Sequence, residues 1–148
     1  LISCNCPRIL IADDDAFNLI ALENILASLK YSVDSAYNGQ QALEKLKKRI
    51  ESPCSSACGG YSIIFLDCNM PIMDGYECMH KLQEIFKQNP DYQCPVIACT
   101  AAVHESEKQK VLESGMSDFA TKPISKQKIQ ELINNTYSIK AKGEYYYL

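Results

Sequence analysis

Five polar residues stand where predicted strands end, and together they could handle a phosphoryl group. Asp13 and Asp14 follow "RILIA", Asp67 ends "YSIIFLD", Thr100 ends "CPVIACT", and Lys122 follows "DFAT". Clustered carboxylates repel one another unless a cation offsets their charge, and an oxygen-only cluster suits Mg2+, with Mn2+ as an alternative. A metal ion, a lysine and a hydroxyl can neutralise a phosphoryl group in transfer, and a carboxylate can be the nucleophile that accepts it. These residues predict a phosphoryl-transfer site, if the fold brings them together.

The hydrophobic patterns predict a fold that does so. Continuous apolar runs are typical of strands buried on both faces of a parallel sheet, and leucines at helical spacing indicate helices between them. We expect strands at 8–13, 31–37, 61–67, 94–100 and 118–123, and helices at 16–30, 40–50, 76–88, 104–115 and 125–137. Right-handed crossovers then give an α/β fold with helices on both faces of the sheet, and its site forms at the carboxyl ends of the strands.

Several local signals refine this pattern. Asp15 and Ser125 are expected to cap the amino ends of the helices that follow them, and Gly115 the carboxyl end of another. The strand at 31–37 is more polar than the others, which favours a position near a sheet edge. The loop at 51–60 is rich in Ser, Gly and Pro, so we expect it to be exposed.

Length, composition and charge limit the classes of function. A chain of 148 residues, 47% hydrophobic and 22% charged, fits one ordinary globular domain. A net charge of −3 argues against binding to nucleic acid or to an anionic membrane. No apolar run approaches the roughly 20 residues of a membrane span. The amino terminus lacks both a signal-peptide layout and an initiator Met, which suggests an excised domain or a processed product, located in the cytoplasm.

Eight cysteines are many for this length. Cys68, Cys78, Cys94 and Cys99 adjoin or lie within predicted elements, where free cysteines act as small buried hydrophobic residues in a reducing compartment. Cys4-x-Cys6 and Cys54-x3-Cys58 could be taken for a four-thiolate zinc site. Neither pair has the C-x2-C spacing typical of such sites and no His lies near them, so the spacing argues against zinc or a disulfide.

Four segments together resemble the signature segments of response-regulator receiver domains, the phospho-acceptor modules of two-component signalling. They are "ILIADDDAFN", "IIFLDCNMPIMDGYE", "PVIACTA" and "DFATKPI", in order and at plausible spacing over roughly residues 8 to 135. The resemblance implies a flavodoxin-like doubly wound sheet of five parallel strands, order 2-1-3-4-5, with five helices. The domain would span 8–137, after an extension at 1–7, with an inserted loop at 51–60 and a tail at 138–148.

The resemblance also implies roles at the acceptor site. Asp67 matches the phosphorylated aspartate, and Asp13 and Asp14 match the acidic pair that binds Mg2+ with it. Asn69, two residues after the acceptor, would add its backbone carbonyl as a metal ligand. Lys122 matches the lysine that pairs with the phosphoryl oxygens, and its bond to Pro123 is cis in the family.

Further positions match the family's switch. Thr100 corresponds to the hydroxyl that bonds the phosphoryl group, and Ala101 keeps access to the site open. Phe119 corresponds to the aromatic residue whose ring moves on phosphorylation. Asn69 and Ala102 fall where family members control how water reaches the phosphorus, and so would tune the lifetime of the phosphoryl group.

A receiver of this kind would take phosphoryl from a phosphohistidine on a histidine kinase or a histidine phosphotransfer protein. It would catalyse its own phosphorylation and slow hydrolysis, but it is not a conventional turnover enzyme. Partners would read the face built from residues 104–135, which could also form a phosphorylation-dependent dimer. The resemblance of "ILIADDDAFN" to hybrid-kinase receivers suggests a piece of a hybrid sensor histidine kinase, tethered to the membrane only through the rest of that chain.

Two alternatives compete with this interpretation. Haloacid-dehalogenase phosphatases use Mg2+ with a D-x-D motif after a first strand, which would make Asp13 the nucleophile. That family expects Thr or Val two residues after the second Asp, where this chain has Phe17, and it has no place for "D-x-x-MP-x-MDG". A degenerate receiver that only mediates contacts would have lost the acceptor, an acidic residue or the lysine, and here all are present.

Overall fold

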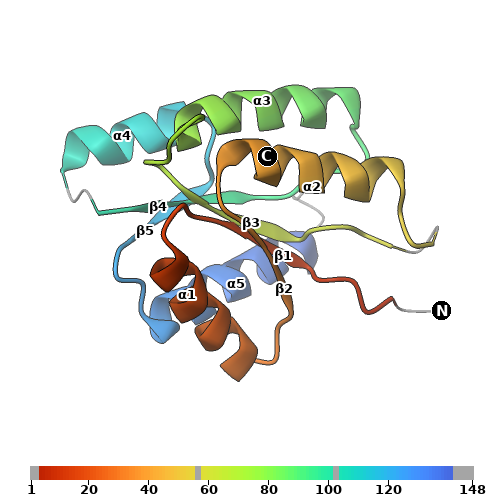
Figure 1. Ribbon diagram of the computed structural model, residues 1–148, viewed down its shortest axis with the longest axis horizontal. Coiled ribbons are helices and arrows are strands. Elements are labelled where there is room, and N and C mark those ends of the chain that lie inside the picture. The colour runs from red at the N-terminus through yellow and green to blue at the C-terminus, as the bar shows by residue number, and fades with distance from the viewer. Residues whose placement is uncertain (1–3, 56–57, 102–103, 142–148) are drawn as a thin grey trace.

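The computed structural model describes residues 4–55, 58–101 and 104–141, with the side chains of 137–141 left out (Figure 1). The elements, in chain order, are β1 (Ile9–Ala12), α1 (Ala16–Ser28), β2 (Val33–Ala36), α2 (Gly39–Glu51), β3 (Ile63–Asp67), α3 (Gly75–Gln88), β4 (Val96–Thr100), α4 (Glu105–Glu113), β5 (Asp118–Thr121) and α5 (Lys126–Ala141). All paired strands are parallel, in the order β2-β1-β3-β4-β5. The predicted fold class is therefore confirmed, including the edge position of the second strand.

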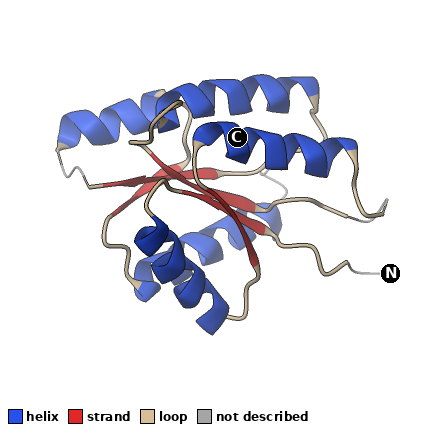
Figure 2. Ribbon diagram, in the orientation of Figure 1, coloured by secondary structure: helices blue, strands red, loops and turns tan. Residues whose placement is uncertain are grey.

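The sheet lies between two layers of helices (Figure 2). Helices α1 and α5 cover one face, and α2, α3 and α4 cover the other. Successive strand side chains point to opposite faces, so each strand feeds both cores. In β1, Ile9 and Ile11 pack toward α1 and α5, whereas Leu10 packs toward α2 and α3. This explains why the central strands are continuously apolar rather than alternating.

The helix caps expected from the sequence are present in the structure. Asp15 Oδ1 accepts from the backbone N–H of Phe17 at 2.8 Å, which confirms it as the N-cap of α1. Ser125 Oγ accepts from Lys128 N–H at 3.1 Å before α5. Gly115 follows α4 with φ of +95°, a left-handed conformation that glycine adopts without strain. Helix α5 extends to Ala141, four residues past the expected end at 137.

Buried thiols occupy the positions predicted for them. Cys68, Cys78, Cys94 and Cys99 are all buried in the packed cores or at strand ends. Within the described parts of the chain, no helix has the length and apolar character needed to cross a membrane.

Candidate functional site

The carboxyl ends of four adjacent strands bring the predicted site residues together. Asp13 follows β1, Asp67 ends β3, Thr100 ends β4, and Lys122 follows β5. Carboxylate oxygens of Asp13, Asp14 and Asp67 all lie within 4.8 Å of one another. Asp13, Asp67 and Thr100 are buried, whereas Asp14 is exposed. Parallel strands place their carboxyl ends at one edge of the sheet, so residues more than fifty positions apart in the sequence share one site.

Lys122 joins the two buried carboxylates. Its Nζ lies 2.7 Å from Asp13 Oδ2 and 3.2 Å from Asp67 Oδ2. The Lys122 N–H donates to Thr100 O at 2.8 Å, and the Lys122–Pro123 bond is cis, as the family resemblance implied. Burial lowers the pKa of Lys122, but its hydrogen bond to Asp13 and the charge of Asp67 outweigh that effect and raise the pKa overall. The lysine therefore carries a fixed positive charge between the two acids.

The side chain of Asp67 holds a proton more readily than an ordinary aspartate does. Burial raises the pKa of Asp67 to about 6, against the opposing effects of the Asn69 backbone N–H and of Lys122. The charge of Asp13 also raises it. The Asn69 N–H donates to Asp67 Oδ1 at 3.2 Å. At neutral pH Asp67 is mainly ionised, and a bound cation would complete that ionisation.

The loop between β3 and α3 is shaped to close over Asp67. Gly75 N–H donates to Cys68 O at 3.0 Å, and a Cβ on Gly75 would lie only 2.4 Å from Asp67 O. Asp74 then caps α3, because its Oδ1 accepts from Glu77 N–H at 2.8 Å. The "MDG" sequence thus combines a helix cap with the one residue that fits against the acceptor strand.

The predicted switch residues lie beside this site. Thr100 is buried at the tip of β4, and Ala101 follows it exposed. Phe119 on β5 is partly buried against the core, with Lys108 Nζ of α4 5.3 Å from the centroid of its ring. Ala102 lies outside the described residues.

The donor set fits Mg2+. It consists of carboxylate oxygens at one strand edge, and Mg2+ prefers oxygen ligands and keeps several waters. Asp13, Asp14 and Asp67 would hold the ion, together with the exposed Asn69 through its carbonyl. The raised pKa of Asp67 also favours a bound cation. Asp67 is buried beside Asp13, and the positive charge of Lys122 does not fully offset the two carboxylates.

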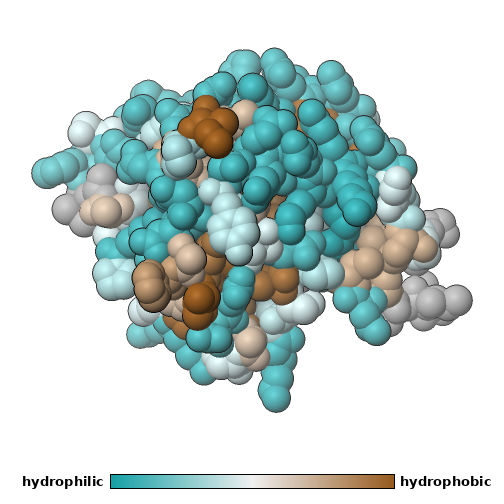
Figure 3. All heavy atoms as spheres, viewed as in Figure 1, coloured by the Kyte–Doolittle hydropathy of each residue, from teal (hydrophilic) through white to brown (hydrophobic). Residues whose placement is uncertain are grey.

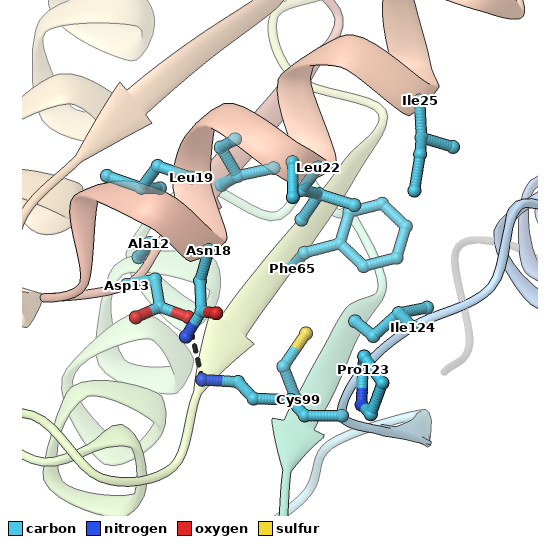
Figure 4. A pocket seen from close by; sticks show the side chains of 13 residues that line it. Ala12, Asp13, Asn18, Leu19, Leu22, Ile25, Phe65, Cys99, Pro123 and Ile124 are labelled. Carbon is cyan, nitrogen blue, oxygen red and sulfur yellow. Dashed lines mark hydrogen bonds and ion pairs between the residues drawn. The ribbon is translucent and has the colours of Figure 1, made fainter.

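Sequence reasoning did not single out the surface around the acids. Asn18, on the first turn of α1, points toward Asp13 at the mouth of an apolar cavity of about 90 Å³ (Figure 4). Phe17 and Ile20 on α1 are 84% and 53% exposed, and Ile72 in the loop before α3 is 82% exposed. Hydrophobic side chains are visible on the surface over α1 (Figure 3). The local sequence gives no signal for the exposure of Phe17 and Ile20, because other hydrophobic residues of the same helix are buried.

Comparisons with known proteins agree with this geometry. The family model described as "Response regulator receiver domain" matches residues 9–134. Hybrid signal transduction histidine kinase L of Dictyostelium discoideum is 34% identical over 126 residues, which is 85% of this chain and 7% of that kinase. The chain therefore spans only a small part of the length of this relative.

Two solved structures have similar folds. One chain from the co-crystal structure of the Saccharomyces cerevisiae histidine phosphotransfer protein Ypd1 with the receiver domain of Ssk1 has a TM-score of 0.77 at 28% identity, covering 91% of this chain and 92% of that one. The receiver domain of a sensor histidine kinase from Pseudomonas aeruginosa, with a magnesium ion coordinated in its active site cleft, has a TM-score of 0.70 at 28% identity, covering 87% and 95%. The haloacid-dehalogenase alternative receives no support, because family model and fold agree on a different scheme.

Proposed function

The chain belongs to the family of response regulator receiver domains of two-component phosphorelays, and we propose that Asp67 is the residue in it that accepts the phosphoryl group. The observation that carries this proposal is the position of Lys122 Nζ, within 3.2 Å of both Asp67 Oδ2 and Asp13 Oδ2 at the carboxyl edge of the sheet. One ammonium group thus offsets part of the charge on the acceptor before the reaction, and it would remain beside Asp67 to pair with the oxygens of the phosphoryl group.

Asp13, Asp14, Asp67 and the Asn69 backbone carbonyl would hold Mg2+ in this proposal, and Mn2+ could occupy the same oxygen ligands. When bound, the ion supplies positive charge to the oxygens of the group in transfer. A similar receiver domain has been solved with magnesium in its active site cleft, and all three carboxylates here can reach one ion.

The reaction needs little movement of the protein. The Asp67 carboxylate oxygen forms a bond to phosphorus while the bond from phosphorus to the donor histidine nitrogen breaks, and the donor leaves as a neutral imidazole after taking up a proton. The Thr100 hydroxyl would donate to a phosphoryl oxygen. Water would later attack the phosphorus, the bond from phosphorus to the Asp67 oxygen would break, and inorganic phosphate would leave with Asp67 back in its free form. Asn69 and Ala102 would set how fast that water arrives, so the domain is not a conventional turnover enzyme.

The phosphoryl group on Asp67 would also change the conformation of the domain. A phosphoryl group that draws Thr100 toward it leaves space into which the Phe119 ring can turn. Phe119 already contacts Lys108 of α4, so its movement would alter the face built from 104–135. That face is the surface we expect partners, including a second phosphorylated copy, to recognise.

The donor would be a histidine kinase or a histidine phosphotransfer protein. Phe17 and Ile20 are exposed on α1, which follows the acidic pair, and Ile72 is exposed in the loop that follows Asp67. These apolar residues could give a protein partner a hydrophobic contact. A similar chain comes from a co-crystal structure with a histidine phosphotransfer protein, and a 34% identical relative is a hybrid histidine kinase. We include in the proposal that this chain is the cytoplasmic receiver of such a hybrid kinase.

Acetyl phosphate with Mg2+ tests the assignment directly. Intact mass should show one added phosphoryl group on the wild type and none on Asp67→Asn. Asp15→Asn is the matched control, because Asp15 caps α1 and asparagine caps equally well, so this variant should still be labelled. A wild type that forms no adduct, or an Asp67→Asn variant labelled as fully as wild type, would overturn the proposal. Label lost in Asp13→Asn but kept in Asp67→Asn would point to the phosphatase scheme.

A further inference from the structure

Four cysteines meet at the edge of the sheet opposite the acidic site. Cys4 and Cys6 lie in the segment before β1, and Cys54 and Cys58 lie in the loop between α2 and β3. Their four Sγ atoms all lie within 4.8 Å of one another, and Cys6 Sγ is 3.4 Å from Cys54 Sγ. The two segments run near each other beside the amino end of β1 in Figure 1.

We propose that these four cysteines bind one Zn2+ ion as a tetrahedral thiolate site. Zinc–sulfur bonds of about 2.3 Å in a tetrahedron place the sulfurs about 3.8 Å apart, close to the spacing found here. Four sulfur ligands leave no open position, which is the arrangement of a structural zinc site rather than a catalytic one. A four-sulfur tetrahedral set favours zinc over the oxygen-preferring Mg2+ of the acidic site.

Contacts other than the sulfurs already hold the two segments together. Arg49 of α2 donates from Nη2 to Pro7 O at 2.7 Å. Arg8 donates from Nη1 to Gly60 O at 3.0 Å, and its own carbonyl accepts from Ser62 N–H at 2.6 Å. Each bond links the chain entering β1 to α2 or to the chain entering β3. The sulfurs are therefore brought together by the fold, and a metal would find its ligands largely in place.

Positive charge surrounds the sulfurs. Arg8 Nη2 lies 3.3 Å from Cys4 Sγ, and the Arg49 guanidinium interacts electrostatically with Cys6 and Cys58. Four thiolates around Zn2+ carry a net charge of about −2. Arg8 can offset part of this charge, whereas Arg49 also pairs with Asp34 at 3.5 Å.

The spacing argument against zinc does not apply to this geometry. It assumes that each ligand pair forms a compact C-x2-C turn. Here the two pairs come from segments 48 residues apart, and the fold brings Cys6 Sγ to 3.4 Å from Cys54 Sγ. The cluster lies at the amino ends of β1 and β3, away from Asp67 at their carboxyl ends. Zinc would fasten the inserted loop to the segment before β1, and this role does not depend on the phospho-acceptor proposal.

Metal content of the wild-type protein, purified with reductant and without added chelator, is the test. We expect one zinc per chain by elemental analysis and, after exchange with Co2+, the intense visible bands of a tetrahedral cobalt–thiolate site. Chelation should lower the melting temperature by several degrees, and added Zn2+ should restore it. Cys6→Ser and Cys58→Ser should each lose most of the bound metal. Cys94→Ala, which removes a thiol outside the cluster, should keep it.

Three results would overturn the proposal: protein that retains no stoichiometric metal and gives no tetrahedral cobalt spectrum, metal equally bound by Cys6→Ser and wild type, or a Cys6–Cys54 disulfide in place of zinc. Labelling by acetyl phosphate distinguishes failure of the zinc proposal from failure of the phospho-acceptor proposal. The cysteine variants should still accept a phosphoryl group at Asp67, which shows that they are folded.

Discussion

Replacing Asp67 by asparagine should make the metal-free domain more stable at neutral pH, although it removes the proposed acceptor. Burial and the nearby Asp13 disfavour the ionised carboxylate, which is why the pKa of Asp67 is raised to about 6 from an ordinary value of 3.8. Asparagine has nearly the same shape and no charge. It therefore keeps the packing and removes the energetic cost of a charge that the native state holds poorly.

The size and the pH window follow from the two pKa values of Asp67. Between about pH 4 and pH 6 the native state holds a proton that the unfolded state has released, so wild-type stability falls as pH rises through this range. The full difference corresponds to about 3 kcal/mol at roughly 1.4 kcal/mol per pKa unit. Asp67 lies at the end of its strand beside the exposed Asp14 and Asn69, so solvent screens part of its charge. We therefore expect about 1–2 kcal/mol, or a rise of about 2–8 °C in Tm.

Thermal and urea unfolding of wild type and Asp67→Asn, in chelator between pH 4 and pH 8, measure this effect. The free energies of unfolding should coincide near pH 4 and separate up to about pH 7. Added Mg2+ should stabilise the wild type more than Asp67→Asn, because one ligand is missing in the variant. Asp15→Asn, at an exposed position, controls for the simple loss of a negative charge and should show no such separation.

Two outcomes would refute the reasoning. If Asp67→Asn is no more stable than wild type at pH 7, Lys122 compensates fully for burial of the carboxylate. If the difference persists undiminished at pH 4, it does not arise from ionisation of Asp67.

Four further predictions follow from the same structure. Lys122→Met should slow acetyl phosphate labelling by about 2- to 100-fold at pH 7, because loss of a neighbouring cation raises the pKa of a carboxylate such as Asp67 by about 1–3 units. In quench-flow assays a higher pH should restore part of the labelling rate, and a loss of rate that does not depend on pH would contradict this account. Gly75→Ala should lower unfolding stability by about 1–3 kcal/mol, because its Cβ would clash with Asp67 O, and unchanged denaturant unfolding would refute the clash. Asp15→Ala should lower stability by about 1 kcal/mol by removing a cap, whereas Asp15→Asn should not. Phosphorylated wild type should show a larger mass by light scattering if residues 104–135 form a dimer, and an unchanged mass would limit that face to other partners.

The fold and most of the acceptor site were predictable because the signals are local. The central strands β1, β3 and β4 are continuous apolar runs, and the polar residue at the end of each run is a candidate site residue. The parallel topology then follows from the helix between every two strands, so Asp13, Asp67, Thr100 and Lys122 had to meet at one edge. The cap at Asp15 was likewise readable, because an N-cap acts only on the next few backbone N–H groups.

The exposed surface near the acids was not predictable in the same way. Phe17 and Ile20 belong to an apolar-looking helix, and nothing in the local pattern says which of its hydrophobic residues face solvent. Their exposure depends on the angle at which α1 lies on the sheet and on how much of it α5 covers. Packing between distant elements decides this, not the period of one helix.

The sequence by itself singled out the residues that we propose for the phosphoryl chemistry, because they stand in fixed positions relative to strands that the same sequence encodes. Only the tertiary structure decided which side chains contact one another. It placed Lys122 Nζ between Asp13 and Asp67, and it brought Cys6 to Cys54, 48 residues away, where spacing had argued against a metal site. The reason is physical: strand and helix signals act over a few residues, whereas these contacts exist only after the sheet has aligned segments that are far apart along the chain.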